Sequence, residues 1–119
     1  MNDTATMTEA ELLRGAYREF NARHMEAVLA RLAPDVEWAN GMEGGHVHGR
    51  EAVRAYWTRQ WAMVDPHVDP ISIAKDVRGR FVVEVHQVVR DLNGAVLMDR
   101  TVHHAYRIVG GLIERMDIE

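Results

Sequence analysis

The fold is decided by RFVVEVHQVVR at Arg80–Arg90, VLMDRTVHHAYRI at Val96–Ile108 and LIERMDI at Leu112–Ile118. These segments are rich in β-branched residues, and polar residues alternate with apolar ones along them. Asn93-Gly94 separates the first segment from the second, and Gly110-Gly111 separates the second from the third. Both dipeptides are typical of tight turns between paired strands. The pattern predicts a three-stranded antiparallel meander.

The N-terminal half carries apolar residues at helical spacing instead. Thr8 and Glu11 fit a capping box, in which each side chain binds a backbone N–H group that the first helical turn leaves free. Pro34 is expected to end the second helix, and Asp65-Pro66 to end the third. The expected helices lie at about 9–22, from Met25 to Leu32, and at about 50–63.

Further strands are expected at Asp35–Asn40, at His46–His48 and at Val68–Val77, where Pro70 suits an edge strand. The element order α-α-β-β-α-β-β-β-β predicts an α+β fold in a single domain over residues 1–119. A strongly curved, mostly antiparallel sheet would wrap around three helices from the N-terminal half. We expect a cone-shaped α+β barrel of this kind to enclose a hydrophobic pocket.

Composition narrows the classes of function. The formal net charge is −4, and no basic stripe is present to neutralise phosphates, so nucleic acid is not an expected partner. The chain has no cysteine, which excludes disulfides, thiolate metal sites and a cysteine nucleophile. No apolar run approaches the roughly 20 residues of a membrane span. The first residues do not read as a signal peptide, so a cytoplasmic location is expected.

Three segments carry a resemblance to a known family. Leu12–Asn40, HGREAVRAYW at 48–57 and YRIVGGLIERMDI at 106–118 resemble the nuclear transport factor 2-like superfamily, and most closely its SnoaL-like and ketosteroid isomerase-like branch. The resemblance implies a cone-shaped fold with a deep pocket, and a homodimer formed through the convex sheet face. Members include isomerases, polyketide cyclases, dehydratases, epoxide hydrolases and small proteins without known activity, so the fold alone does not assign a reaction.

The ketosteroid isomerase reaction itself is not expected. The resemblance places Asn40 where the isomerase has its carboxylate base, and an amide cannot take up a proton at neutral pH. It places His104 at the oxyanion-binding acid of the isomerase. The tyrosine of the first helix falls at Ala16, with Tyr17 one residue away. All three positions depart from the isomerase pattern.

Strand parity identifies His104 as the main catalytic candidate. Met98, Arg100, Val102, His104, Tyr106 and Ile108 share one strand face, which we expect to point at the helices. A histidine inside the cone could act as an acid or base, or as a hydrogen-bond donor to an oxyanion. The alternative is a buried neutral imidazole with a structural partner. His103 would then face outward.

Three other residues are catalytic candidates beside His104. Tyr17 could assist it, and Asn40 could bind a substrate carbonyl, although asparagine also suits the start of the turn at Gly41. Asp117 would be the best carboxylate base if it faced inward, where it could also orient His104. The alternative for Asp117 is a solvated charge at the end of a strand.

Large aromatic side chains are the candidates for substrate binding, because a cavity walled by aromatic residues with few polar groups is the usual ligand site. At helical spacing such residues are more often ordinary core. The expected substrate-binding residues are Phe20, Trp38, Tyr56, Trp57, Trp61 and Tyr106.

Metal and cofactor sites are weakly indicated. His46 and His48 share a strand face, but a metal site would need a third ligand, such as Glu43, Asp117 or His104. No cofactor is expected, since the paired glycines read as turns and not as a phosphate-binding loop. Two interpretations therefore stay open. One is a cofactor-independent isomerase, cyclase or dehydratase acting on a small hydrophobic carbonyl compound, and the other is a non-catalytic ligand-binding or dimerisation module.

Overall fold

The computed structural model describes residues 8–119, which form three helices and a six-stranded sheet. The expectation that the first residues are not a signal peptide concerns residues outside this range. The helices are α1 (Glu9–Asn21), α2 (Met25–Leu29) and α3 (Arg50–Met63). The strands are β1 (Leu32–Ala39), β2 (His46–His48), β3 (Asp65–Lys75), β4 (Phe81–Arg90), β5 (Val96–Val109) and β6 (Leu112–Ile118).

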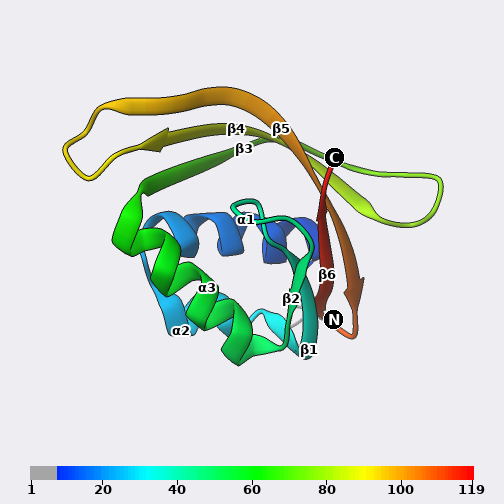
Figure 1. Cartoon of the computed structure of the whole chain (residues 1–119). Coiled ribbons are helices and arrows are strands. Elements are labelled where there is room, and N and C mark those ends of the chain that lie inside the picture. Colours follow the sequence, from blue (N-terminus) through cyan, green and yellow to red (C-terminus); the bar gives the residue numbers. More distant parts are fainter. Residues whose placement is uncertain (1–7) are drawn as a thin grey trace.

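The sheet is mixed but mostly antiparallel, with strand order β2-β1-β6-β5-β4-β3. The pair β1–β6 is parallel, and every other neighbouring pair is antiparallel. Strands β3, β4 and β5 arch over α1, while β1, β2 and β6 lie to one side of the helices (Figure 1). This arrangement confirms the α+β cone and the C-terminal meander.

Local signals set the start of α1 as expected. The Thr8 hydroxyl oxygen accepts a hydrogen bond from the Glu11 backbone N–H at 3.1 Å, and the Thr8 N–H donates to the Glu11 carboxylate at 2.9 Å. The capping box therefore supplies partners for N–H groups that the helix itself cannot satisfy.

The expected bounds of α2, β1 and β3 were wrong, and β1 begins at Leu32 instead of Asp35. Helix α2 ends at Leu29, and Pro34 lies inside β1. The strand tolerates Pro34 because the ladder between β1 and β6 is irregular from Leu32 to Glu37. Strand β3 already begins at Asp65 and ends at Lys75, and it tolerates prolines because it is an edge strand of the sheet.

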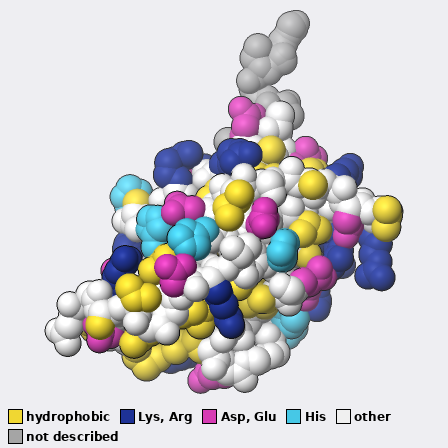
Figure 2. Space-filling view, turned by 90° about the horizontal axis from the view of Figure 1, so that it is seen from above, with side chains coloured by type: hydrophobic (Ala, Val, Ile, Leu, Met, Phe, Trp, Pro, Cys, Tyr) yellow, Lys and Arg dark blue, Asp and Glu magenta, His cyan; other side chains and the backbone are white. Residues whose placement is uncertain are grey.

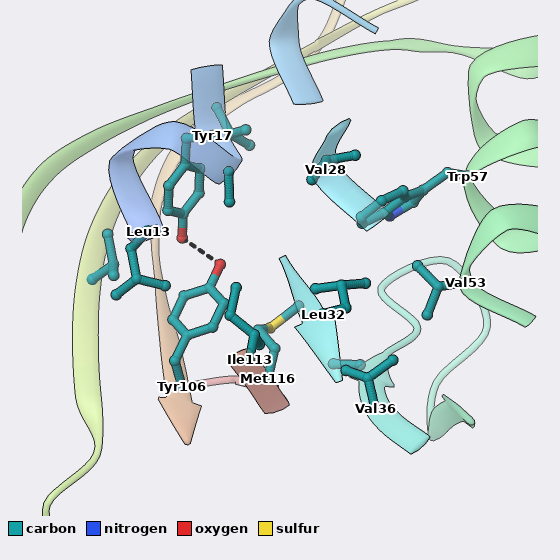
Figure 3. Packing of buried hydrophobic residues seen from close by; sticks show 14 of the residues in the cluster. Leu13, Tyr17, Val28, Leu32, Val36, Val53, Trp57, Tyr106, Ile113 and Met116 are labelled. Atoms are coloured by element: carbon teal, nitrogen blue, oxygen red, sulfur yellow. Dashed lines mark hydrogen bonds between the residues drawn. The ribbon is translucent and has the colours of Figure 1, made fainter. Parts of the chain in front are cut away.

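Apolar side chains of the helices pack against the concave face of the sheet. Leu13 of α1, Val53 and Trp57 of α3, Val83 of β4 and Ile113 of β6 are all buried. Figure 3 shows Trp57 and Val53 projecting from α3 toward this cluster, and Leu13 packing from α1. This core fixes the positions of the three helices relative to the sheet.

The convex face of the sheet is polar. His67 and Asp69 of β3 lie 3.1 Å apart, and His86 of β4 and Asp99 of β5 lie 2.7 Å apart. Figure 2 looks down on this face and shows histidines beside acidic side chains. Homodimerisation through this face stays a prediction. Within residues 8–119, no helix is long and apolar enough to cross a membrane.

Replacement of Trp57 by alanine tests the assignment of α3 to the core. Trp57 is 1% exposed, so Trp57→Ala should lower the free energy of unfolding by roughly 3–5 kcal/mol. Leu97→Ala is the control, because Leu97 is 60% exposed and should change stability by less than about 0.5 kcal/mol. Urea denaturation measures both. Equal losses in the two variants would contradict the packing described here.

Candidate functional site

A cavity of about 490 Å³ lies between the concave face of the sheet and the helices. Its wall is mainly apolar and aromatic, as in most small-molecule sites. Among the described residues that line it there is no aspartate or glutamate, and Arg100 is the one formally charged side chain. Of the residues predicted from the sequence, the wall contains Tyr17, Phe20, Trp38, Tyr56, Trp57, His104 and Tyr106.

A chain of hydrogen bonds connects α1 to β5 at this wall. The Tyr106 hydroxyl donates to the Tyr17 hydroxyl at 2.8 Å, and the Tyr17 hydroxyl lies 2.8 Å from Nδ1 of His104. Figure 3 shows the two tyrosine hydroxyl groups pointing at each other. His104 and Tyr106 are alternate residues of β5 and share its inner face, as strand parity predicted.

The direction of this chain fixes the tautomer of His104. Tyr106 is buried, and its hydroxyl proton has one acceptor among residues 8–119, the Tyr17 oxygen. The Tyr17 proton is then donated to Nδ1 of His104. The reverse direction would leave a buried Tyr106 O–H group without an acceptor, at a cost of about 1–3 kcal/mol. Nδ1 therefore accepts, and the imidazole proton is on Nε2.

Nε2 of His104 has no hydrogen-bond partner in the described part of the chain, and it is not among the fully enclosed polar atoms that lack one. Because His104 lines the cavity, this N–H group is available to a ligand. The planes of the imidazole and the Tyr17 ring are nearly parallel, at 8° to each other, with ring centroids 5.9 Å apart. The site therefore presents an oriented hydrogen-bond donor.

Burial controls the charge of His104, Tyr17 and Tyr106. Desolvation, with a smaller effect from the charge of His103, lowers the pKa of His104 to about 4, so the imidazole is neutral at pH 7. Desolvation likewise raises the pKa of Tyr17 and of Tyr106 well above the ordinary tyrosine value. All three groups are neutral at physiological pH, which makes His104 a donor and a weak base.

Aromatic rings form the rest of the wall. Trp38 of β1 packs edge-on against Trp57 of α3, with centroids 5.2 Å apart. Phe20 of α1 also packs edge-on against Trp57, with centroids 5.3 Å apart. Tyr56 lines the cavity, and its hydroxyl accepts a hydrogen bond from the Gly41 backbone N–H at 3.1 Å. The pocket and the core thus share the same side chains.

Trp61 does not line the cavity, contrary to the expectation for this residue. It stacks on the outer side of the aromatic cluster, with its ring centroid 6.0 Å from that of Trp57. The Arg23 guanidinium lies over the Trp61 ring at 5.1 Å from its centroid. Helical spacing put Trp61 on the apolar face of α3, but only the part of this face that meets the cavity contributes to its wall.

Asn40 is also absent from the cavity wall. Its side-chain oxygen accepts hydrogen bonds from the backbone N–H groups of Met42 at 3.0 Å and Glu43 at 2.9 Å, and its amide nitrogen donates to the Glu43 carboxylate at 2.9 Å. The side chain therefore organises the turn between β1 and β2, which was the alternative role for this asparagine.

Asp117 lies on the opposite face of the sheet from His104. It pairs across the ladder with Ala105, whereas His104 pairs with Ile118. Nε of Arg115 donates to the Asp117 carboxylate at 2.9 Å, and His46 Nε2 lies 2.9 Å from the same group. The hydrogen bonds from Arg115 and His46 hold the pKa of Asp117 below its usual value. The structure therefore does not bring this carboxylate to His104.

A register shift in β6 explains why strict alternation did not settle which sheet face Asp117 occupies. The shift falls between the Arg107–Arg115 and Ile108–Ile113 pairs. It lets Ile113 and Met116 both point into the core, although strict alternation would put them on opposite faces. Strict alternation along β6 therefore assigns the wrong sheet face to the residues on one side of the shift.

His46 and His48 do not meet a third metal ligand. Among residues 8–119, no group of three or more histidine, cysteine, aspartate or glutamate side chains is placed to hold a metal ion. Arg115 Nη2 lies 3.3 Å from Nε2 of His46, so a guanidinium occupies the space beside this imidazole. A cation there would also be repelled by the arginine.

Three polar residues of the wall were not singled out from the sequence. They are Gln60 of α3, Gln87 of β4 and Arg100 of β5. Gln87 and Arg100 face each other across the β4–β5 ladder. Arg100 stands on the strand face that alternation assigned to the interior, and Gln87 pairs with it, so parity contained the signal. Their polar character made them look like interruptions of a core face.

Folding stability should depend on pH through His104. The pKa is about 4 in the folded chain and 6.5 ordinarily, so between these values the unfolded chain binds a proton that the folded chain lacks. This stabilisation is complete above about pH 6.5 and decreases as the pH falls. Wild type should lose about 2–3 kcal/mol more between pH 7 and pH 4.5 than His104→Leu, as measured by urea denaturation. His103→Leu is the control, and a wild-type pH dependence in His104→Leu would refute the shift.

The tautomer can be tested by ¹⁵N nuclear magnetic resonance of the imidazole. The spectrum should show a protonated Nε2 and an unprotonated Nδ1 for His104 at pH 7. Tyr17→Phe removes the acceptor of the buried Tyr106 proton and should lower the free energy of unfolding by about 1–3 kcal/mol. A proton on Nδ1 in the wild type would overturn the assigned direction of the chain.

Comparison with known proteins agrees with this architecture. A family model described as a SnoaL-like domain matches residues 13–116. No curated protein sequence matches the chain. A solved structure of an NTF2-like protein of unknown function from Burkholderia pseudomallei is 26% identical, with a TM-score of 0.82 over 96% of this chain and 91% of that chain.

Two other solved structures share the fold. A putative polyketide cyclase from Pseudomonas putida is 24% identical, with a TM-score of 0.79 over 96% of this chain and 92% of that chain. A computationally designed 17-OHP binder is 19% identical, with a TM-score of 0.77 over 91% of this chain and 88% of that chain. The family match covers most of the described residues, and the chain belongs to the SnoaL-like domain family of the NTF2-like superfamily.

Proposed function

We propose that this protein binds a small, mainly apolar carbonyl compound in the cavity and activates it by a hydrogen bond from Nε2–H of His104 to the carbonyl oxygen. The observation that carries the proposal is the chain from Tyr106 through Tyr17 to His104, with its protons oriented toward the cavity. Such a donor is prepared before a ligand arrives, so it costs no reorganisation when negative charge develops on the oxygen.

The neutral state of His104 supports a role as donor more than as base. A pKa of about 4 makes the imidazole a poor proton acceptor at pH 7, whereas its N–H group still polarises a carbonyl. Enzymes do use a neutral histidine in this way beside an enolate. The reaction type that fits is an isomerisation or a cyclisation in which a carbonyl oxygen acquires negative charge.

The cavity wall limits which substrates suit this chemistry. No carboxylate lines it in the described part of the chain, so the substrate proton would leave to water. This favours substrates with an acidic C–H group, such as one between two carbonyls or between a carbonyl and an aromatic ring. The aromatic wall of Trp38, Trp57 and Phe20 suits a flat, ring-containing body.

A second candidate function is ligand binding without turnover. The missing carboxylate favours it, because proton abstraction by the protein is the step that the wall supports least. The designed 17-OHP binder, a protein of this fold made for binding, is consistent with a cone that holds a ligand without reacting with it. The two candidates share the cavity and the His104 donor but differ in rate acceleration.

One experiment on 2-tetralone, labelled with ¹³C at the carbonyl, separates the candidates. Bound ketone should show its carbonyl stretch at a lower infrared frequency in the wild type and in His103→Ala, but not in His104→Ala. His103 is the matched control, because it neighbours His104 and points outward. If the protein is an enzyme, exchange of the ketone α-protons in D₂O should be faster with wild type, and about 10²–10³-fold slower with His104→Ala.

Two outcomes would change the proposal. A shifted carbonyl band without accelerated exchange supports the binding function. An unshifted band in the wild type, or the same shift in His104→Ala, removes His104 as the donor and sinks the proposal.

A further inference from the structure

We infer that the ligand is an acid: Arg100 forms a subsite for an anionic group, such as a carboxylate or a sulfonate, in the part of the cavity that solvent reaches. This inference rests on the proposed function, because it names the class of compound that the same cavity takes. The ligand would then be elongated, with a carbonyl oxygen at His104 and an acidic group at Arg100.

The position of Arg100 carries the first step. It stands four residues before His104 on the inner face of β5, which places the two backbones roughly 13 Å apart along the strand. His104 is buried, whereas Arg100 is exposed and still lines the cavity. His104 therefore lies in an enclosed part of the cavity, and Arg100 lies in a part that solvent reaches.

The charge of Arg100 is not compensated within residues 8–119. Its guanidinium donates no hydrogen bond and forms no ion pair there, and no carboxylate lines the cavity. Its neighbour Asp99 lies on the other face of β5 and is 2.7 Å from His86. By contrast, Arg107 on the outer face of the same strand donates to Glu114 at 2.7 Å.

Two side-chain amides of the cavity wall add hydrogen-bond donors to the charge of Arg100. Gln87 lies directly opposite on β4, and Gln60 lines the cavity from α3. Neither side-chain amide has a hydrogen-bond partner among the described residues. The Arg100 guanidinium and the Gln87 amide beside it offer several N–H donors and no negative charge, a set that matches the oxygen atoms of an acid.

The apolar middle of the cavity defines the rest of the ligand. On the inner face of β5 Val102 lies between Arg100 and His104, and the apolar wall continues beyond Arg100 with Met98 and its cross-strand partner Val89. A ligand that satisfied both ends would place about 10 Å of mainly apolar, ring-containing framework between its two oxygen-bearing groups. A volume of about 490 Å³ accommodates a molecule of that size.

A pair of fluorescent probes tests the charge preference. The probes are 8-anilinonaphthalene-1-sulfonate and N-phenyl-1-naphthylamine, which share one aromatic framework and differ in the sulfonate. Arg100→Gln should weaken binding of the sulfonate about tenfold and change binding of the neutral probe by less than about twofold. Arg107→Gln is the matched control and should change neither. Added salt should weaken the sulfonate complex of wild type more than that of Arg100→Gln.

The outcomes separate this inference from the function on which it rests. If Arg100→Gln leaves sulfonate binding unchanged, the anionic subsite is overturned. The proposed function still stands in that case, provided that the neutral probe binds and 2-tetralone displaces it. An equal loss for both probes also overturns it, because the substitution would then act through the shape of the cavity. Failure of wild type to bind 2-tetralone and both probes overturns the proposed function and this inference together.

Discussion

A buried hydroxyl proton on Tyr106 constrains much of the site. Because Tyr106 lies in the core, its proton must find an acceptor inside the protein, and the Tyr17 oxygen provides it. That bond ties α1 to β5 and passes the orientation on to His104. The packing of the cone and the polarity of its cavity are thus linked, since the same contact joins α1 to β5 and sets which nitrogen of His104 carries the proton.

Strand parity was a sound guide on β4 and β5, where long regular ladders keep alternate residues on one face. It placed His104 and Tyr106 inside from the sequence alone. It could not place Asp117, because the register shift in β6 is set by contacts with β5 that no local pattern reveals. Helical periodicity identified the aromatic face of α3, but it cannot separate Trp57, at the cavity, from Trp61 beside it.

The distribution of charge differs between the two faces of the sheet. The chain is acidic as a whole, with a net charge of −4. On the outer face carboxylates meet cations or imidazoles, as Asp117 does with Arg115 and Asp99 with His86. Within the described residues the cavity wall holds a guanidinium and no carboxylate. An acidic protein can therefore still offer an anion a favourable place, since charges on the far side of the sheet are compensated locally.

The turn that Asn40 organises also forms part of the cavity wall. Gly41 and Met42 of this turn line the cavity, and Gly41 is bound to the Tyr56 hydroxyl. A side chain at Gly41 would come within 3.3 Å of Ile118. The residues from 41 to 45 are exposed and carry no part of the core. Loop exchange at this hairpin is therefore a route to a differently shaped cavity, because this part of the wall can change while the buried packing of the core is kept.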